Sequence, residues 1–214
     1  EALATVMPEW RRLLLEVPNV PDMSVPEGEK AQDNQEVRRW GEAPEFKFAP
    51  KSHVELMNAQ DLLDLERGAQ AAGFRGYFLK NEAVQLSFAL WQYGLTEMIK
   101  KDFKPLIVPS LVKRELLLGT GYLPQGEDDL YQTQDDAYLA GTGEVGTMGY
   151  FMDRVIDFSD LPQKIVSFSP CFRREAGAYG QDAKGLIRVH EFFKVEQLVI
   201  SEASHERSVR LHEE

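Results

Sequence analysis

Apolar residues recur at every third or fourth position in several stretches of the chain, which is the spacing of a helix that buries one face. Residues 59–73 show this repeat, and Gly73 is suited to end the helix. In residues 110–121, Ser110 is a candidate N-cap and Gly119 a candidate end. The predicted helices span residues 1–17, 59–73, 83–102, 110–121 and 204–214.

Short apolar segments bounded by glycine, proline and polar residues are typical of strands. They cover residues 104–110, 137–145, 163–175 and 187–200. Because several strands follow one another instead of alternating regularly with helices, we expect an α+β fold with helices against an antiparallel sheet. Five prolines among polar residues predict an irregular connector over residues 18–52.

The last two strands are predicted to pair as a long hairpin, with charged residues on either side of a glycine-rich connection. Side chains along a strand alternate between its two faces, so Arg173 and Glu175 should share a face of the first strand. The residues expected together on one face of the second strand are His190, Phe192, Lys194 and Glu196, with Arg188 added if the strand extends that far and Val189 on the other face.

This face of the hairpin carries side chains that suit an elongated, charged ligand. The planar guanidinium of Arg173 could bind a phosphate through two hydrogen bonds. Phe192 could stack on a base, and Glu196, about 13 Å further along the strand, could accept hydrogen bonds from an amine. A half-buried strand with a solvated charged face has the same alternation, and by periodicity alone it is the more frequent case.

Composition narrows the classes of protein that fit. The net charge of −11, from 24 basic and 35 acidic residues, argues against a chain that coats nucleic acid non-specifically, although a local basic patch remains open. A single cysteine forms no internal disulfide and suits a reducing compartment. No apolar run approaches the length of a membrane span, and four scattered histidines show no metal-ligand spacing. We therefore expect a cytoplasmic protein without a membrane partner.

The hairpin also carries a resemblance to a known family. Residues 172–196, FRREAGAYGQDAKGLIRVHEFFKVE, resemble without a gap the second signature motif of the class II aminoacyl-tRNA synthetases in its seryl-tRNA synthetase form. Residues 101–112 resemble the first class II motif, and residues 119–145 resemble the segment that ends in the family's T-x-E motif. Residues 17–56 resemble the connector between the arm and the catalytic domain.

The resemblance implies a class II synthetase-like fold and a reaction in two steps. Serine and ATP give seryl-adenylate and pyrophosphate, and the 3′ end of tRNA(Ser) then takes the seryl group. The implied cofactors are ATP and Mg²⁺. The implied partners are L-serine, tRNA(Ser) and a second copy of the chain, while tRNA(Sec) is left open as a further acceptor.

The resemblance also implies a role for individual residues. Arg173 matches the catalytic arginine that holds the α-phosphate and also touches serine. The residues that match the ATP site are Arg173, Arg174, Glu175, Arg188, Val189 and Phe192, with Glu175 at the adenine amino group, Arg188 at the terminal phosphates and Phe192 stacked on adenine. The residues that match the serine site are Thr142, Gly143, Glu144, Arg173 and Glu196. Gly143 departs from the alanine or serine usual in the family, and we expect this glycine to loosen the pocket.

The resemblance finally implies a division of the chain. Residues 1–17 would end the family's helical arm, 18–52 would form the connector, and 53–214 would begin the catalytic domain. The family's third motif has no counterpart in these residues, so we expect part of a longer synthetase. A synthetase-like chain that binds a nucleotide or an amino acid without complete catalysis is the alternative.

Overall fold

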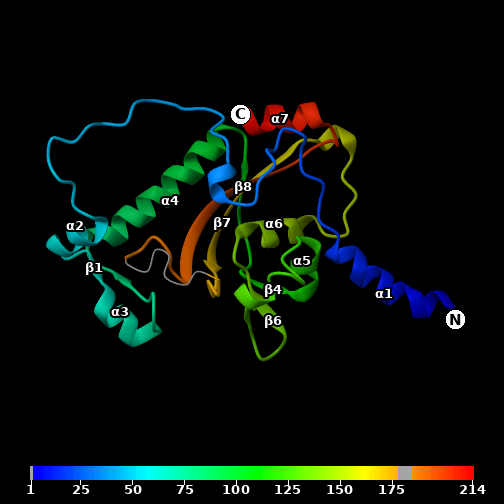
Figure 1. Cartoon of the computed structure of the whole chain (residues 1–214), viewed down its shortest axis with the longest axis horizontal. Coiled ribbons are helices and arrows are strands. Elements are labelled where there is room, and N and C mark those ends of the chain that lie inside the picture. Colours follow the sequence, from blue (N-terminus) through cyan, green and yellow to red (C-terminus); the bar gives the residue numbers. More distant parts are fainter. Residues whose placement is uncertain (1, 178–184) are drawn as a thin grey trace. The chain divides into compact units, whose positions relative to one another are not determined.

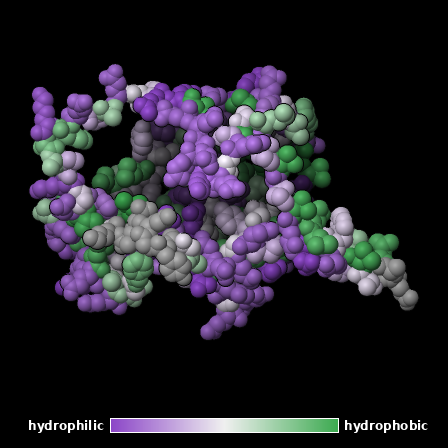
Figure 2. All heavy atoms as spheres, in the orientation of Figure 1, coloured by the Kyte–Doolittle hydropathy of each residue, from purple (hydrophilic) through white to green (hydrophobic). Residues whose placement is uncertain are grey.

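The computed structural model describes residues 2–177 and 185–214, and the chain divides into two compact units, Glu1–Ser52 and His53–Glu214. In the first unit, α1 (Ala2–Glu16) is followed by an irregular segment with one 3₁₀ turn, η1 (Ala31–Asp33). Hydrophobic side chains lie at the surface of α1 (Figure 2), where Trp10 and Leu13 are about half exposed.

The second unit contains the remaining elements in a mixed order (Figure 1). Its helices are α2 (His53–Ala59), α3 (Leu65–Ala72), α4 (Glu82–Lys100), α5 (Arg114–Gly119), α6 (Gly143–Phe151) and α7 (His205–Glu213), with 3₁₀ turns η2 (Glu127–Asp129) and η3 (Phe158–Asp160). Its strands are β1 (Leu63–Asp64), β2 (Phe78–Leu79), β3 (Lys104–Ile107), β4 (Leu111–Lys113), β5 (Tyr131–Gln132), β6 (Ala137–Leu139), β7 (Gln163–Phe172) and β8 (Glu191–Ile200). Across the described residues, no helix combines the length and the apolar character that a membrane crossing requires.

The main sheet has the strand order β3-β7-β8. β7 and β8 pair antiparallel along their whole length, with Ser167 opposite Glu196 and Phe168 opposite Val195. β3 instead runs parallel to β7, which the long segment between them allows because parallel neighbours need a crossover connection. The sheet is therefore mixed, and the predicted α+β class is confirmed.

Helices cover both faces of the β7–β8 pair (Figure 1). On one face, the Trp91 ring of α4 lies 4.8 Å from the Phe193 ring and 5.4 Å from the Phe168 ring, measured between centroids. On the other face, Gly143 of α6 lies against the hydroxyls of Ser167 and Ser169. Residues that alternate along each strand therefore face different helices.

A smaller antiparallel sheet, ordered β4-β6-β5, carries the buried apolar core that supports α6. Val112 of β4, Leu117 of α5, Tyr138 of β6 and Val145 of α6 belong to one buried cluster. Burying such side chains contributes about 1.5–3 kcal/mol each. This core fixes the start of α6 near the end of β7, where the Phe172 N–H donates to the Ala140 carbonyl at 3.0 Å.

Two predicted helices were wrong at their starts. α2 ends at Ala59, Asp61 adopts a positive φ of 56°, and β1 intervenes before α3. The Asp64 carboxylate accepts a hydrogen bond from the Arg67 N–H at 2.9 Å, and this N-cap starts α3 later than the apolar repeat predicts. Ser110 is not a cap either, because β4 pairs with β6 and α5 begins only at Arg114.

All four predicted strands were too long. β3 ends at Ile107 and not at residue 110. β6 ends at Leu139, and α6 begins at Gly143 instead of a continuing strand. β7 ends at Phe172, and Glu175 has a positive φ of 55°, so Arg173 and Glu175 do not alternate on a strand. β8 starts at Glu191, which leaves Arg188, Val189 and His190 outside it.

Candidate active site

The N-terminal turn of α6 lies against the face of β8 that carries Glu196. Thr142 is the N-cap of this helix, is 3% exposed, and its Oγ1 accepts from the Glu144 N–H at 3.5 Å. Threonine is favoured at this position because its oxygen satisfies an amide that the helix leaves without a partner. The T-x-E pattern thus marks a helix start, and it exposes backbone N–H groups toward β8.

Glu196 is the point where these groups meet. Its Oε2 atom accepts from Thr142 Oγ1 at 2.6 Å and from the Glu144 N–H at 3.2 Å. Lys194, two residues earlier on β8, places its Nζ 3.0 Å from the same oxygen. One carboxylate oxygen is therefore bound by a hydroxyl, a helix-terminal amide and an ammonium group.

The environment of Glu196 favours its ionised form. Burial alone would raise the pKa of the carboxyl, but the hydrogen bonds from Thr142 and Lys194, the positive charge of Lys194 and the Glu144 amide together lower it below its ordinary value. Glu196 is thus a carboxylate at neutral pH, ready to bind a cation.

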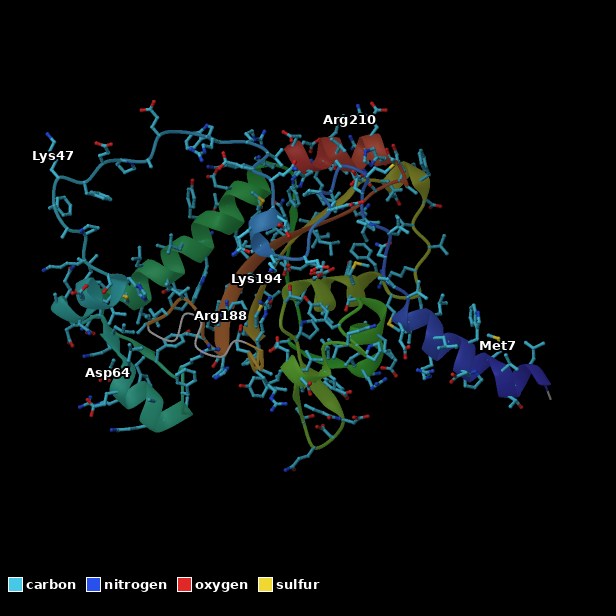
Figure 3. All side chains as sticks on the ribbon, in the orientation of Figure 1. Met7, Lys47, Asp64, Arg188, Lys194 and Arg210 are labelled. Atoms are coloured by element: carbon cyan, nitrogen blue, oxygen red, sulfur yellow. The ribbon has the colours of Figure 1, made fainter. Side chains whose placement is uncertain are left out.

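Lys194 was not assigned a role from the sequence, although strand alternation placed it beside Glu196. Its Nζ donates to Thr142 Oγ1 at 2.6 Å as well as contacting Glu196. The sequence signal that could have identified this role of Lys194 is the i, i+2 spacing of two opposite charges on one face of a strand. Figure 3 shows Lys194 along β8 and Arg188 beyond the start of that strand.

The glycine at position 143 has a steric reason. A Cβ there would lie 2.8 Å from Ser167 Oγ, 3.0 Å from Ser169 Oγ and 3.3 Å from Glu196 Oε2. Both serines are almost fully buried. Two hydroxyls therefore fill the space that a larger residue at position 143 would need, and the close packing differs from the loosened pocket expected from the sequence.

Arg173 lies beside the N-cap of α6. Its Nε donates to the Gly141 carbonyl at 3.2 Å, and its guanidinium carbon lies 5.3 Å from the centre of the Phe192 ring. His190 holds the backbone of Arg173 twice, because its carbonyl accepts the Arg173 N–H at 2.9 Å and its Nδ1 lies 3.0 Å from the Arg173 carbonyl. Since a carbonyl only accepts, Nδ1 carries the proton in this contact, and His190 holds the backbone of Arg173 in place.

Glu175 and Arg188 form a separate, partly buried ion pair. Arg188 Nη1 donates to Glu175 Oε2 at 2.7 Å, and the side chains are 32% and 10% exposed. Both line a hollow of about 340 Å³ beside Asp128 and Asp129. The connection between β7 and β8 thus brings together two residues assigned to the ATP site.

The two remaining residues of the predicted ATP site differ in exposure. The Arg174 side chain is exposed and lines a different hollow of about 380 Å³ with Gln132 and Tyr138. Val189 is 8% exposed.

The far end of the connection is tied to the start of the unit. The Leu186 N–H donates to His53 Nε2 at 3.1 Å, and Gly185 adopts a positive φ of 83° against His53 and Val54. The part of the predicted connection at residues 178–184 lies outside the described residues.

Residues 127–212 match the family described as the tRNA synthetase class II core domain (G, H, P, S and T). The chain is 45% identical over 200 residues to the serine–tRNA ligase of Treponema denticola, an alignment that covers 92% of this chain and 47% of that protein. The chain therefore spans about half the length of the curated relatives it matches.

Two solved structures share the fold. Seryl-tRNA synthetase from Pyrococcus horikoshii, complexed with ATP, has a TM-score of 0.93 and 35% identity, covering 99% of this chain and 52% of its own. Cytoplasmic serine–tRNA ligase from Naegleria fowleri, in complex with AMP, has a TM-score of 0.91 and 30% identity, covering 99% and 51%. The predicted resemblance to the seryl-tRNA synthetases and the predicted class II synthetase-like α+β fold are both confirmed.

Proposed function

From this likeness to the seryl-tRNA synthetases, we propose that the protein carrying this chain is a serine–tRNA ligase that uses ATP. The observation that carries the proposal is the convergence of Thr142, the Glu144 amide and Lys194 on Glu196, next to Arg173. Glu196 and Thr142 are 54 positions apart in the sequence. This arrangement joins an ammonium-binding carboxylate to a phosphate-binding guanidinium.

In the first step, a serine carboxylate oxygen forms a bond to the α-phosphorus of ATP. The bond from that phosphorus to the bridging oxygen breaks, and pyrophosphate leaves with the electron pair. In the second step, a ribose hydroxyl of tRNA(Ser) attacks the seryl carbonyl carbon, and its proton passes to a phosphate oxygen of the adenylate. The bond from that carbon to the bridging phosphate oxygen breaks, and AMP leaves with the electron pair. The first step needs positioning and neutralisation of phosphate charge, which we assign to Arg173 as the catalytic residue.

We assign serine binding to the groups around Glu196. Its carboxylate would bind the serine ammonium, with Thr142, Gly143 and Glu144 at the wall formed by α6. In the structure, Lys194 holds the same oxygen of Glu196, so an incoming ammonium would share or replace that contact. A site built for polar groups discriminates against alanine, because the groups that meet the serine hydroxyl would then lack a partner.

We assign ATP binding to the β7–β8 connection. Phe192 would stack on adenine and Glu175 would accept from its amino group, while Arg188 would reach the terminal phosphates. Arg188 has five N–H donors, so it can keep its bond to Glu175 while it binds phosphate. Arg174 and Val189 would contribute only through their main chains.

Magnesium would accompany ATP as a counter-ion, as the resemblance implies. Within the described residues, no group of three or more His, Cys, Asp or Glu side chains is arranged to hold a metal ion. We therefore assign no residue of this chain to magnesium and derive no step through it. tRNA(Ser) is the proposed acceptor, and the cytoplasm is the proposed location.

We propose a homodimer that uses the outer face of α4. Leu86, Leu90 and Tyr93 recur at helical spacing and are 60%, 60% and 65% exposed, and Ile107 of β3 is 86% exposed. Trp91, on the same helix, instead packs on the sheet. Exposed apolar residues in such a stripe are typical of an interface.

Leu90→Glu tests this interface, because a charge placed there must be desolvated on association. Sedimentation of the wild-type protein at micromolar concentration should give a dimer, and Leu90→Glu should give folded monomers. Gln92→Glu, on the same helix and already polar and exposed, should remain dimeric. A wild-type protein that sediments as an active monomer would exclude the interface.

Serine-dependent exchange of pyrophosphate into ATP tests the proposed activity. Exchange should require serine and should fall by orders of magnitude with alanine or glycine. ATP binding without exchange in the presence of any amino acid would favour the alternative, a synthetase-like protein without complete catalysis. Exchange supported equally by another amino acid would reject serine as the substrate.

A further inference from the structure

Glu175, which the proposed function places at adenine, sits in an unusual backbone conformation. Its φ is 55°, in the left-handed region that side-chain-bearing residues seldom adopt. Its carboxylate accepts a hydrogen bond from Arg188 at 2.7 Å, and its side chain is 10% exposed. A conformation of this kind persists only when its surroundings hold it.

Asp129 binds the backbone N–H groups of both residues that flank Glu175. The Asp129 carbonyl accepts from the Arg174 N–H at 3.0 Å. The Asp129 carboxylate, through Oδ1, accepts from the Ala176 N–H at 3.2 Å. Asp129 ends η2 and is 47 positions from Ala176 in the sequence, so neither contact follows from local structure.

The two contacts differ in what they need from the side chain. Any residue at position 129 offers the carbonyl to Arg174, but only an acceptor of the right length reaches the Ala176 N–H. Asp128, the neighbouring carboxylate, is exposed and lines the same hollow as Glu175 and Arg188. General negative charge in this hollow therefore does not depend on Asp129 alone.

We propose that Asp129 is a positioning residue for Glu175, holding its backbone so that the carboxylate meets the adenine amino group; this rests on the proposed function. Asp129 itself touches no ATP atom in this proposal. Its carboxylate oxygen acts by position and not by charge. Loss of that oxygen should weaken ATP binding and leave serine binding unchanged.

Three variants at position 129 separate the effect of where the carboxylate oxygen lies from the effect of its charge. Asp129→Asn keeps an acceptor oxygen in place without the charge and should stay within about threefold of the wild-type KM for ATP. Asp129→Glu keeps the charge but moves the oxygen by one methylene, and Asp129→Ala removes it. Both should raise the KM for ATP by about tenfold, with the KM for serine within about twofold. Glu127→Ala, the matched control on the same 3₁₀ turn, removes a carboxylate that does not line this hollow and should behave as wild type.

A double-variant cycle gives the second readout. In a Glu175→Ala background, Asp129→Ala should produce no further rise in the KM for ATP, because Asp129 acts only through Glu175. Additive effects, equal damage to serine and ATP, or a normal Asp129→Glu variant would each overturn the proposal. If Asp129→Ala does not fold, the comparison of Asp129→Asn with Asp129→Glu still decides it.

Direct titration of the full protein with ATP keeps this test independent of the overall reaction. Absence of serine-dependent exchange in the wild type would reject the proposed function. The affinity for ATP alone would still rank Asp129→Asn with the wild type and Asp129→Glu below it if Asp129 positions Glu175. Equal ATP affinities of the wild type, Asp129→Asn, Asp129→Glu and Asp129→Ala would reject the role of Asp129.

Discussion

The two faces of the β7–β8 pair differ in chemistry although they share the same backbone. The face toward α6 carries Ser167, Ser169, Lys194 and Glu196, and these polar side chains contact one another or the start of α6. The face toward α4 carries Phe168 and Phe193, stacked at 5.8 Å and in contact with Trp91. Alternation along two strands thus separates the candidate chemistry from the packing that supports it.

Adjacent residues on one strand can therefore have different roles, one in chemistry and the next in packing. Lys194 lies between Phe193 and Val195, yet it faces the opposite helix. A substitution on the polar face should therefore change kinetics with little loss of stability. A substitution on the aromatic face should reduce stability with little change in substrate preference.

Arg173→Ala, on the polar side of the β7–β8 pair, should have the largest effect on activity. Losing a guanidinium that stabilises phosphate charge in the transition state should reduce kcat/KM by roughly 10²–10³-fold, about 3–4 kcal/mol. Pyrophosphate exchange measures it, and the melting temperature should hardly change. Arg174→Ala is the control, because that side chain is exposed in a different hollow, and equal losses in the two variants would remove Arg173 from the role.

Trp91→Ala probes the aromatic face. Its ring packs on Phe168 and Phe193 but is only partly buried, so the free energy of unfolding should fall by about 2–3 kcal/mol, less than a fully buried tryptophan would lose. Denaturant titration measures this loss. The KM values for serine and ATP, measured well below the melting temperature, should stay within about twofold. A selective rise in the KM for serine would break the separation of the two faces.

Glu196→Gln separates serine binding from ATP binding within the polar face. The amide keeps the shape but loses the charge that would bind the serine ammonium, so the KM for serine should rise by about ten- to thirtyfold. The KM for ATP should change little. Steady-state exchange at varied serine and varied ATP separates these effects, and comparable damage to both substrates would show that Glu196 serves the fold.

The pH dependence of stability should show the smallest effect, and it also depends on Glu196. Because the pKa of Glu196 is lowered in the folded protein, its ionised form stabilises the fold above the ordinary pKa of glutamate, about 4.3. That contribution is lost as the pH falls through the lowered folded value. The difference in unfolding free energy between wild type and Glu196→Gln should therefore shrink on acidification from pH 6 to about pH 3. A difference that stays constant or grows would contradict the lowered pKa.

Local patterns predicted much of the fold but misplaced several element boundaries. The apolar repeat located α4, and the strand alternation placed Phe192, Lys194 and Glu196 together on β8. The T-x-E segment was taken as a strand end, because its glycines and short apolar run match both a turn and a helix start. A capping threonine followed by a glutamate in the first turn was the signal that could have found α6.

Which residues alternate along each strand depends on local backbone geometry, so this pattern and the residue types suited to a charged ligand could be predicted from the sequence. Which of these residues meet depends on how distant elements pack. Thr142 reaches Glu196, and Asp129 holds the peptide groups beside Glu175, across separations of 54 and 47 positions between the bonded residues. The physical reason is that such contacts depend on how the core around Tyr138 and Val145 seats α6 against β8, and no periodicity along the chain records the relative placement of packed elements.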